Sequence, residues 1–205
     1  MIIEFCAESY EYAMKAEKAG ADRIELCKDL HLDGLTPDYK SAKRTIDTLN
    51  IPVFVLIRPR KGDFMYSDEE FELMKQDILK FKEMGCKGIV SGVLNDDNSI
   101  DIKRTKKLVE LSRPLEFTFH RAFDVVSDPL EEIENLIRLG VNRILTSGQK
   151  EKAIDGLVLL EQLKRISNNR ILIMPGSGIS NMNFMKFNSF NEIHGSFRDG
   201  VPIIN

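Results

Sequence analysis

Short apolar runs alternate with longer amphipathic segments along the whole chain. The short runs are rich in β-branched and aromatic residues and are bounded by turn-forming residues, a pattern typical of buried strands. They predict eight strands, at residues 2–6, 23–27, 52–58, 88–92, 115–120, 143–146, 170–174 and 192–195.

The longer segments between these strands repeat their apolar residues at helical spacing. They predict helices at 10–20, 37–49, 67–84, 101–111, 128–139, 150–167 and 180–187. Ser67 and Ser127 precede acidic or proline-containing first turns and are predicted N-caps. Gly20, Gly85 and Gly140 stand where three of the helices should end.

Strands that alternate with helices predict parallel pairing through right-handed crossovers, and eight such units close naturally into a barrel. We therefore expect one domain over residues 1–205, a TIM-type (β/α)₈ barrel. The alternative is an open, doubly wound sheet. It is disfavoured because Cys6-Ala-Glu-Ser follows the first strand, where such sheets carry a glycine-rich phosphate-binding turn.

Only residues 196–205 follow the eighth strand, too few for a full outer helix. We expect the last outer helix to be short or missing, which would leave apolar surface thinly covered between strands eight and one. Either a partner subunit or the tail Val201-Pro-Ile-Ile would cover this gap. A homo-oligomer, a dimer or larger, is accordingly expected.

The composition excludes several classes of protein. The 205 residues are 42% hydrophobic and 30% charged, as in globular domains, and no apolar run approaches the roughly 18 residues that span a bilayer. The net charge is −3 with interleaved signs, so neither a nucleic-acid nor a membrane partner is expected. Three cysteines do not make a disulfide framework, and no secretory signal is visible; we expect a cytoplasmic location.

In a barrel of this type, function sits at the carboxyl ends of the strands. The first two predicted strands both end in Glu-x-Cys, as Glu4-Phe-Cys6 and Glu25-Leu-Cys27. Side chains alternate along a strand, so the glutamate and cysteine of each pair share a face. The residues on the opposite face of each strand are apolar, as is expected for residues that pack against the outer helices. We expect all four polar residues to point into the barrel.

The paired cysteines allow two interpretations. Thiolates select Cu(I) or zinc, and two alone suit the low coordination number of Cu(I). Cys6 and Cys27 are therefore candidate Cu(I) ligands; no organic cofactor is implied. The alternative is two small buried residues, because free cysteine is among the most buried residue types. Cys86 is expected in the core.

The paired carboxylates also allow two interpretations. If Glu4 and Glu25 lie close together inside the barrel, repulsion between their carboxylates raises the pKa of one of them. That residue could then donate a proton while the other acts as a base. The alternative is a structural ion-pair layer with Arg23, Arg58 or Arg121. His120 and Asp124, at the end of the fifth strand, join the candidate catalytic residues.

Further polar residues follow the later strands and predict a site for a small anion. Arginines would bind the anion and the glycine turns would offer backbone N–H groups, as phosphate-binding barrels do after strands seven and eight. The candidates are Arg58, Arg60, Asp63, Tyr66, Arg121, Ser147, Gly176, Ser177, Gly178, His194, Gly195 and Ser196.

Several segments together resemble the CutC family, named for copper homeostasis. They are Asp22-Arg-Ile-Glu-Leu-Cys27, Gly34-Leu-Thr-Pro37, Ile57-Arg-Pro-Arg-x-Gly-Asp-Phe-x-Tyr66, Thr118-Phe-His-Arg-Ala-Phe-Asp124, Arg143-Ile-Leu-Thr-Ser-Gly-Gln149, Met174-Pro-Gly-x-Gly178 and His194-Gly-Ser196.

The resemblance implies a cytoplasmic, homo-oligomeric TIM-type barrel linked to copper homeostasis, with Cu(I) on Cys6 and Cys27. The alternative is a barrel enzyme of unassigned reaction, in which Glu4, Glu25 or His120 moves protons on a small phosphorylated or sugar-like anion.

Overall fold

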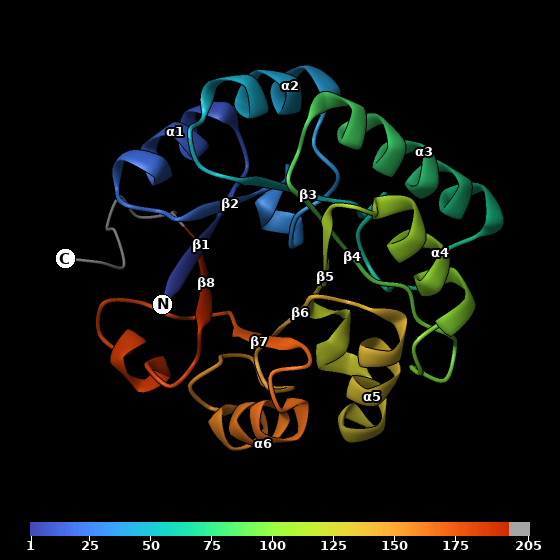
Figure 1. Cartoon of the computed structure of the whole chain (residues 1–205), viewed down its shortest axis with the longest axis vertical. Helices are drawn as coiled ribbons and strands as arrows, with labels where there is room; N and C mark the ends of the chain where they lie inside the picture. Colours follow the sequence, from blue (N-terminus) through green and yellow to red (C-terminus); the bar gives the residue numbers. More distant parts are fainter. Residues whose placement is uncertain (197–205) are drawn as a thin grey trace.

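Eight parallel strands form a ring at the centre of the protein, and helices surround it (Figure 1). The computed structural model describes residues 1–196 of the chain. The strands are β1 (Ile2–Ala7), β2 (Arg23–Leu26), β3 (Val53–Leu56), β4 (Gly88–Ser91), β5 (Glu116–Phe119), β6 (Arg143–Thr146), β7 (Leu172–Pro175) and β8 (Glu192–Ser196). The predicted TIM-type barrel is confirmed.

Six α-helices and three short 3₁₀ helices connect these strands within the described residues. The α-helices are α1 (Tyr10–Lys18), α2 (Tyr39–Thr48), α3 (Asp68–Met84), α4 (Ile102–Ser112), α5 (Pro129–Leu139) and α6 (Leu157–Ser167). The 3₁₀ helices are η1 (Leu30–Leu32), η2 (Arg121–Val125) and η3 (Phe184–Phe187). None of the helices between residues 1 and 196 is long and apolar enough to cross a membrane.

Helix ends follow local chemistry. Ser67 caps α3 through the predicted capping box, in which its side chain accepts from Glu70 N and the Glu70 carboxylate accepts from Ser67 N. Gly85 and Gly140 end α3 and α5 with positive φ angles of 94° and 79°. For α5 the N-cap is Asp128 rather than the predicted Ser127, because the Asp128 carboxylate accepts from the first-turn amides.

Two predicted helices are shorter than their apolar patterns indicated. Residues 150–156 form turns and α6 begins only at Leu157, because Gly156 packs against the backbone of Ser147 and Gly148 too closely for any side chain. In the segment 180–187 only η3 forms. There the Asn183 side chain bonds the backbone of Ser180 and Gly178 and competes with helical hydrogen bonds.

The strands pair in sequence order, and β8 pairs with β1, from Ile2 opposite Glu192 to Cys6 opposite Ser196. Within residues 1–196 no ladder joins β7 to β8. The predicted absence of a full last helix, and the tail Val201-Pro-Ile-Ile, concern residues outside the described part of the chain.

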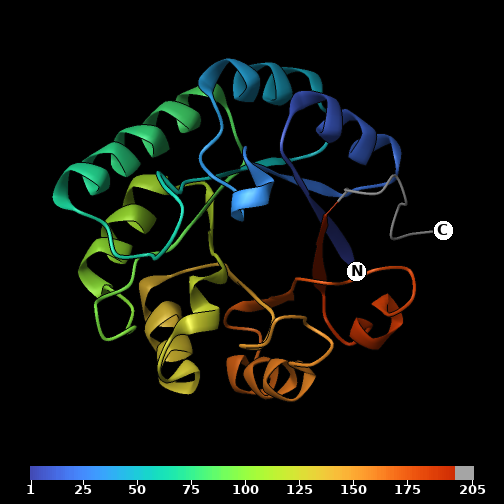
Figure 2. The same ribbon diagram turned by 180° about the vertical axis from the view of Figure 1, so that it is seen from behind.

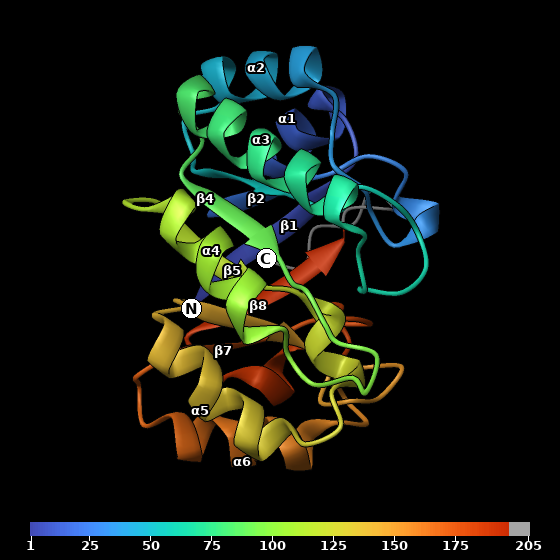
Figure 3. The same cartoon turned by 90° about the vertical axis from the view of Figure 1, so that its right-hand side faces the viewer.

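The strand arrows of β4 and β8 point to the same side in Figure 3, and η1 lies on that side. Figure 2 views the barrel from this end, with η1 projecting over the centre of the ring. We call this end, where the carboxyl ends of the strands meet, the barrel mouth.

Gly88 leaves space for the Phe54 ring inside the barrel. Phe54 points inward, with the guanidinium groups of Arg23 and Arg143 stacked 4.7 and 5.0 Å from its ring centroid. A Cβ at Gly88 would lie 2.5 Å from the Phe54 ring. The ring therefore fits only because Gly88 has no side chain.

We predict that Gly88→Ala lowers the free energy of unfolding by about 1–3 kcal/mol, the usual cost of overpacking a filled interior. Urea unfolding checks this value. The double variant Gly88→Ala/Phe54→Leu should lose less than the sum of its two single variants, because the smaller side chain frees the space. Strict additivity would contradict the steric explanation.

Candidate functional site

The strand register brings the Glu-x-Cys pairs together inside the barrel. Glu4 lies opposite Arg23 and Cys6 lies opposite Glu25 across β1 and β2. Phe5, Ile24 and Leu26, the alternating residues, are fully buried in the apolar core cluster that the outer helices share. Glu4, Cys6, Glu25 and Cys27 therefore all lie on the interior face.

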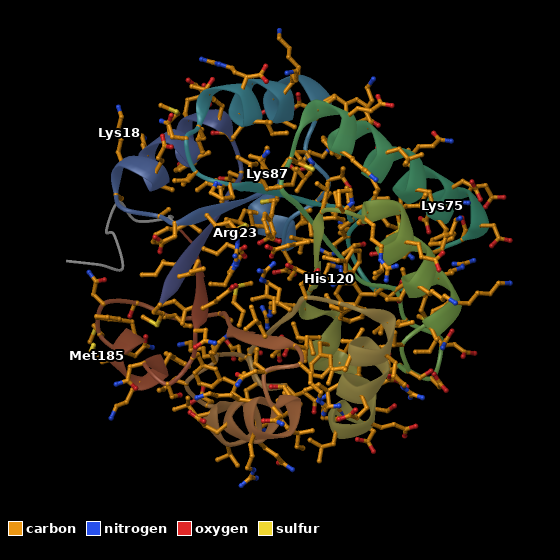
Figure 4. The ribbon with its side chains drawn as sticks, in the orientation of Figure 1. Lys18, Arg23, Lys75, Lys87, His120 and Met185 are labelled. Carbon is orange, nitrogen blue, oxygen red and sulfur yellow. The ribbon has the colours of Figure 1, made fainter. Side chains whose placement is uncertain are left out.

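Below the mouth, four charged residues from β1, β2, β6 and β8 form a buried ion-pair layer. Arg23 Nε donates to Glu4 Oε2 and Arg23 Nη2 to Glu192 Oε2, both at 2.5 Å. Arg143 Nε donates to the same Glu192 oxygen at 2.9 Å, and its Nη2 reaches Glu116. Figure 4 shows Arg23 inside the ring of strands. The ion-pair interpretation of Glu4 is thus realised with Arg23.

Above this layer, the His194 ring lies between the two glutamates. His194 Nδ1 is 2.8 Å from Glu4 Oε1, and its Nε2 is 3.4 Å from Glu25 Oε2. Burial alone would raise the pKa of Glu4, but the bond to His194 and the charge of Arg23 outweigh it and lower this pKa to about 2. An ionised carboxylate only accepts, so His194 Nδ1 donates to Glu4.

The second glutamate, Glu25, differs from Glu4 in the direction of its pKa shift. Burial raises the pKa of Glu25 to about 6, even though His194 opposes that shift. The pKa of His194 is also raised: the carboxylates of Glu25 and Glu4 outweigh the opposing effect of burial. An imidazole between two carboxylates of such different pKa is suited to passing a proton between them.

The two cysteine sulfurs lie 3.4 Å apart, at the carboxyl ends of β1 and β2. Cys6 is 6% exposed and Cys27 1% exposed, and both thiols are free. Their hydrogen bond and their burial raise the pKa of Cys6 well above its usual range. Leu30 of η1 packs against the small apolar cluster that contains this pair, and Gly34 lies beside the Cys27 side chain.

The donor atoms of Cys6, Glu25 and His194 all lie within 4.8 Å of one another. A sulfur, an imidazole nitrogen and a carboxylate oxygen at this spacing could share one metal ion. These residues also form part of the wall of a cavity of about 550 Å³ at the barrel mouth. The candidate metal ligands are therefore reached from the mouth.

Arg58 and His120 line another part of this cavity. Arg58 is 5% exposed and donates to the carbonyl oxygens of Leu32, Gly34 and Gly62, so it fixes the loops after β2 and β3. His120 lies inside the ring of strands in Figure 4, and its Nδ1 accepts from Ala122 N at 3.2 Å.

Asp124 and Arg121 lie on η2 and also line the cavity. The Asp124 carboxylate accepts from Arg121 Nε, Thr146 Oγ1 and the backbone N–H groups of Ser147 and Gln149. With its oxygens so occupied, Asp124 holds the loop after β6 in place. Ser147 lies beside Arg121, bonded to Nη2 at 3.3 Å, but does not line the cavity.

Three further predicted anion-site residues, all between β3 and α3, also lie outside the cavity wall. Arg60 forms ion pairs with Asp63 and Glu70, and its guanidinium lies over the Tyr66 ring. Asp63 is exposed, whereas the Tyr66 hydroxyl is buried. This group stabilises the loop between β3 and α3.

The glycine turns after β7 and β8 are brought together at the mouth. Ser177, Gly178, Gly195 and Ser196 line the cavity with His194. Gly176 lies behind them, where a Cβ would meet Leu145 at 2.5 Å and His194 at 3.3 Å. Its role here is to let the turn pack closely against β6 and β8.

Sequence reasoning missed Glu192 and Arg143, the remaining members of the ion-pair layer, and grouped His194 with the anion-binding residues, although a histidine at a strand end can also move protons or bind a metal. A signal was present: Glu192-Ile-His194 repeats on β8 the inward Glu-x-Cys spacing of β1 and β2. Comparing alternation across all eight strands would have identified the interior face of β8.

Comparisons with known proteins agree with this architecture. The model of the CutC family matches residues 1–199. The human copper homeostasis protein cutC homolog is 44% identical over 200 residues, 96% of this chain and 73% of that protein. A CutC family protein of Pasteurella multocida is 44% identical over 197 residues, 95% of this chain and 81% of that protein.

A solved structure of a copper homeostasis protein CutC from Streptococcus agalactiae superposes with a TM-score of 0.89 at 35% identity. The match covers 95% of this chain and 98% of that one. Both the sequence and the barrel are thus shared along nearly the full described length. This chain belongs to the CutC family.

Proposed function

We propose that this protein binds Cu(I) in copper homeostasis, through the thiolates of Cys6 and Cys27 at the barrel mouth. The observation that carries the proposal is the 3.4 Å separation of the two sulfurs on neighbouring strands. Sulfurs this close can share one ion with little movement of the backbone. Thiolate ligands select soft ions, and Cu(I) accepts a low coordination number.

His194 is the candidate third ligand. One of its ring nitrogens lies within 4.8 Å of the Cys6 sulfur, although Cys27 is not part of this close group, and its Nδ1–H is held by Glu4. A carboxylate that orients the far nitrogen of a ligating histidine is a recurrent arrangement at metal centres. The oxygen of Glu25 is a harder donor and suits Cu(I) less well.

Two thiolates and an imidazole would also accept zinc. The names of the relatives favour copper over zinc for this site. Because the site needs reduced thiols, we further propose a cytoplasmic location, where thiols stay reduced. The three free cysteines fit such a compartment.

The decisive experiment is a Cu(I) competition titration against a chromophoric chelator under anaerobic, reducing conditions. The double variant Cys6→Ser/Cys27→Ser should lose the tight phase of binding, because a hydroxyl is a poor ligand for a soft ion. A parallel titration with zinc measures selectivity.

Cys86→Ser is the matched control. Cys86 is equally buried, at 2% exposure, but packs in the core cluster around the barrel rather than in the cysteine cluster at the mouth. Its variant should bind Cu(I) like the wild type. Tight binding that survives in the double variant, or that disappears with Cys86, would end the proposal.

A further inference from the structure

Arg58 is a buried arginine without an acidic partner. Arg23 and Arg143, inside the same barrel, each bond two carboxylates. All three hydrogen bonds of the Arg58 guanidinium go to neutral carbonyl oxygens. Among residues 1–196 no carboxylate lies within ion-pair distance of it. A buried charge normally requires a counter-charge, because burial strips away its water.

Neighbouring side chains do not supply that negative charge. Burial raises the pKa of Tyr66 to about 12, so the phenol beside Arg58 stays neutral. Burial, together with Arg58, lowers the pKa of His120 to about 3, so this ring is neutral as well. The nearby carboxylate of Asp124 is already paired with Arg121. Asp33 and Glu25 also line the cavity, but neither lies within ion-pair distance of Arg58, so this guanidinium has no direct counter-charge among residues 1–196.

Polar atoms without hydrogen-bond partners gather in the same region. Within residues 1–196 four buried side-chain N or O atoms have none, and three of them belong to Arg58 (Nε), His120 (Nε2) and Tyr66 (Oη). His120 Nδ1 accepts from a backbone amide, so the proton is on Nε2 and this atom needs an acceptor. Phe64 packs against both Arg58 and His120 and links them.

The cavity beside these donors is much larger than a single ion needs. Its volume of about 550 Å³ falls in the range typical of small-molecule sites, and Arg58, His120 and Arg121 all line it. The Arg121 side chain is 42% exposed and lies along the same wall, where its Nε is paired with Asp124. Leu56, Leu145 and Ile179 make other parts of the wall apolar.

We propose that Arg58 and Arg121 bind the carboxylate or phosphate group of a small organic molecule in this cavity, with its apolar part against Leu145 and Ile179. The anion would lie against the guanidinium of Arg58 at the cavity wall and balance its charge. The cavity would then hold an organic anion in addition to any metal. The proposed site uses neither cysteine and does not depend on copper binding.

The test follows the Nε–H resonances of the arginines by ¹⁵N NMR in metal-free protein, during titrations at constant ionic strength. The probes are inorganic phosphate and propionate, and their relative affinities decide which group the site prefers. We expect saturable shifts of the Arg58 and Arg121 signals with at least one probe. Arg121→Gln should weaken that probe about 10- to 100-fold, the effect of losing a charged hydrogen bond.

Arg60→Gln is the matched control, since it removes the same charge from the loop after β3 but lies outside the cavity wall. It should leave the affinity unchanged. If circular dichroism shows that Arg58→Gln is folded, this variant should also abolish binding. If Arg58→Gln is not folded, Arg121→Gln alone tests the proposal. The proposal is wrong if neither probe shifts the Arg58 signal, or if Arg60→Gln weakens binding as much as Arg121→Gln. Repeating the titration in Cys6→Ser/Cys27→Ser separates this outcome from failure of the copper site.

Discussion

Replacement of Arg23 by methionine is expected to lower the free energy of unfolding by about 3–5 kcal/mol, the cost of leaving buried charges unpaired. Arg23 is the common partner of Glu4 and Glu192, and all three side chains are at least 95% buried. Without it, the Glu4 carboxylate keeps only His194, and Glu192 keeps only Arg143. Urea unfolding at neutral pH measures the loss.

Arg170→Met is the matched control. Arg170 also bonds a carboxylate at two points, but its pair with Glu134 is about half exposed, and surface pairs contribute about 0–1 kcal/mol. The double variant Arg23→Met/Glu4→Gln should recover part of the stability, because it removes one unpaired charge. Equal losses for Arg23→Met and Arg170→Met would show that the ion-pair layer contributes no more than a surface pair.

The second large effect concerns pH. Burial, followed by the charge of Arg58, lowers the pKa of His120 from 6.5 to about 3. The unfolded chain therefore binds a proton at His120 that the folded chain excludes. Stability from this group is complete above pH 6.5 and is lost as the pH falls towards 3, by about 1.4 kcal/mol for each unit, or roughly 5 kcal/mol over the full window.

His120→Asn should remove this dependence, since an asparagine oxygen can accept from Ala122 N and does not titrate. Unfolding free energies of wild type and variant, measured between pH 4.5 and 7.5, should therefore converge as the pH falls. His31→Asn, at an exposed histidine, should run parallel to the wild type throughout. A constant difference between His120→Asn and wild type would mean that His120 is protonated as easily in the fold as outside it.

Local patterns were sufficient to predict the barrel. Each strand is a short buried run between turn residues, and caps such as Ser67, Gly85 and Gly140 depend only on near neighbours. Helices were overpredicted where individual contacts compete with helical hydrogen bonds, as the Asn183 side chain does with the backbone of Ser180 and Gly178. Gly156 packs on the loop after β6, and this contact, which prevents a helix over 150–156, leaves no periodic trace in the sequence.

The candidate site was predictable to the extent that it follows alternation along a strand. Alternation placed Glu4, Cys6, Glu25 and Cys27 on one face, and the register then brought the two sulfurs together. It could not tell which arginine pairs with which glutamate. Nor could it show that Arg60 pairs with Asp63 and Glu70 whereas Arg58 is buried without a carboxylate, since these contacts depend on side-chain packing in three dimensions.

The short helix η1 projects over the barrel mouth, where the proposed Cu(I) site lies. Leu30 packs against the cluster that contains Cys6 and Cys27, and the backbone of η1 is held by hydrogen bonds to Glu8 and Arg58. In the proposed Cu(I) site, an ion would approach through the cavity, where Cys6 lines the wall and Cys27 does not. Its exchange would then depend on movement of η1, which is held by hydrogen bonds to Glu8 and Arg58, as well as on the strength of the sulfur–metal bonds.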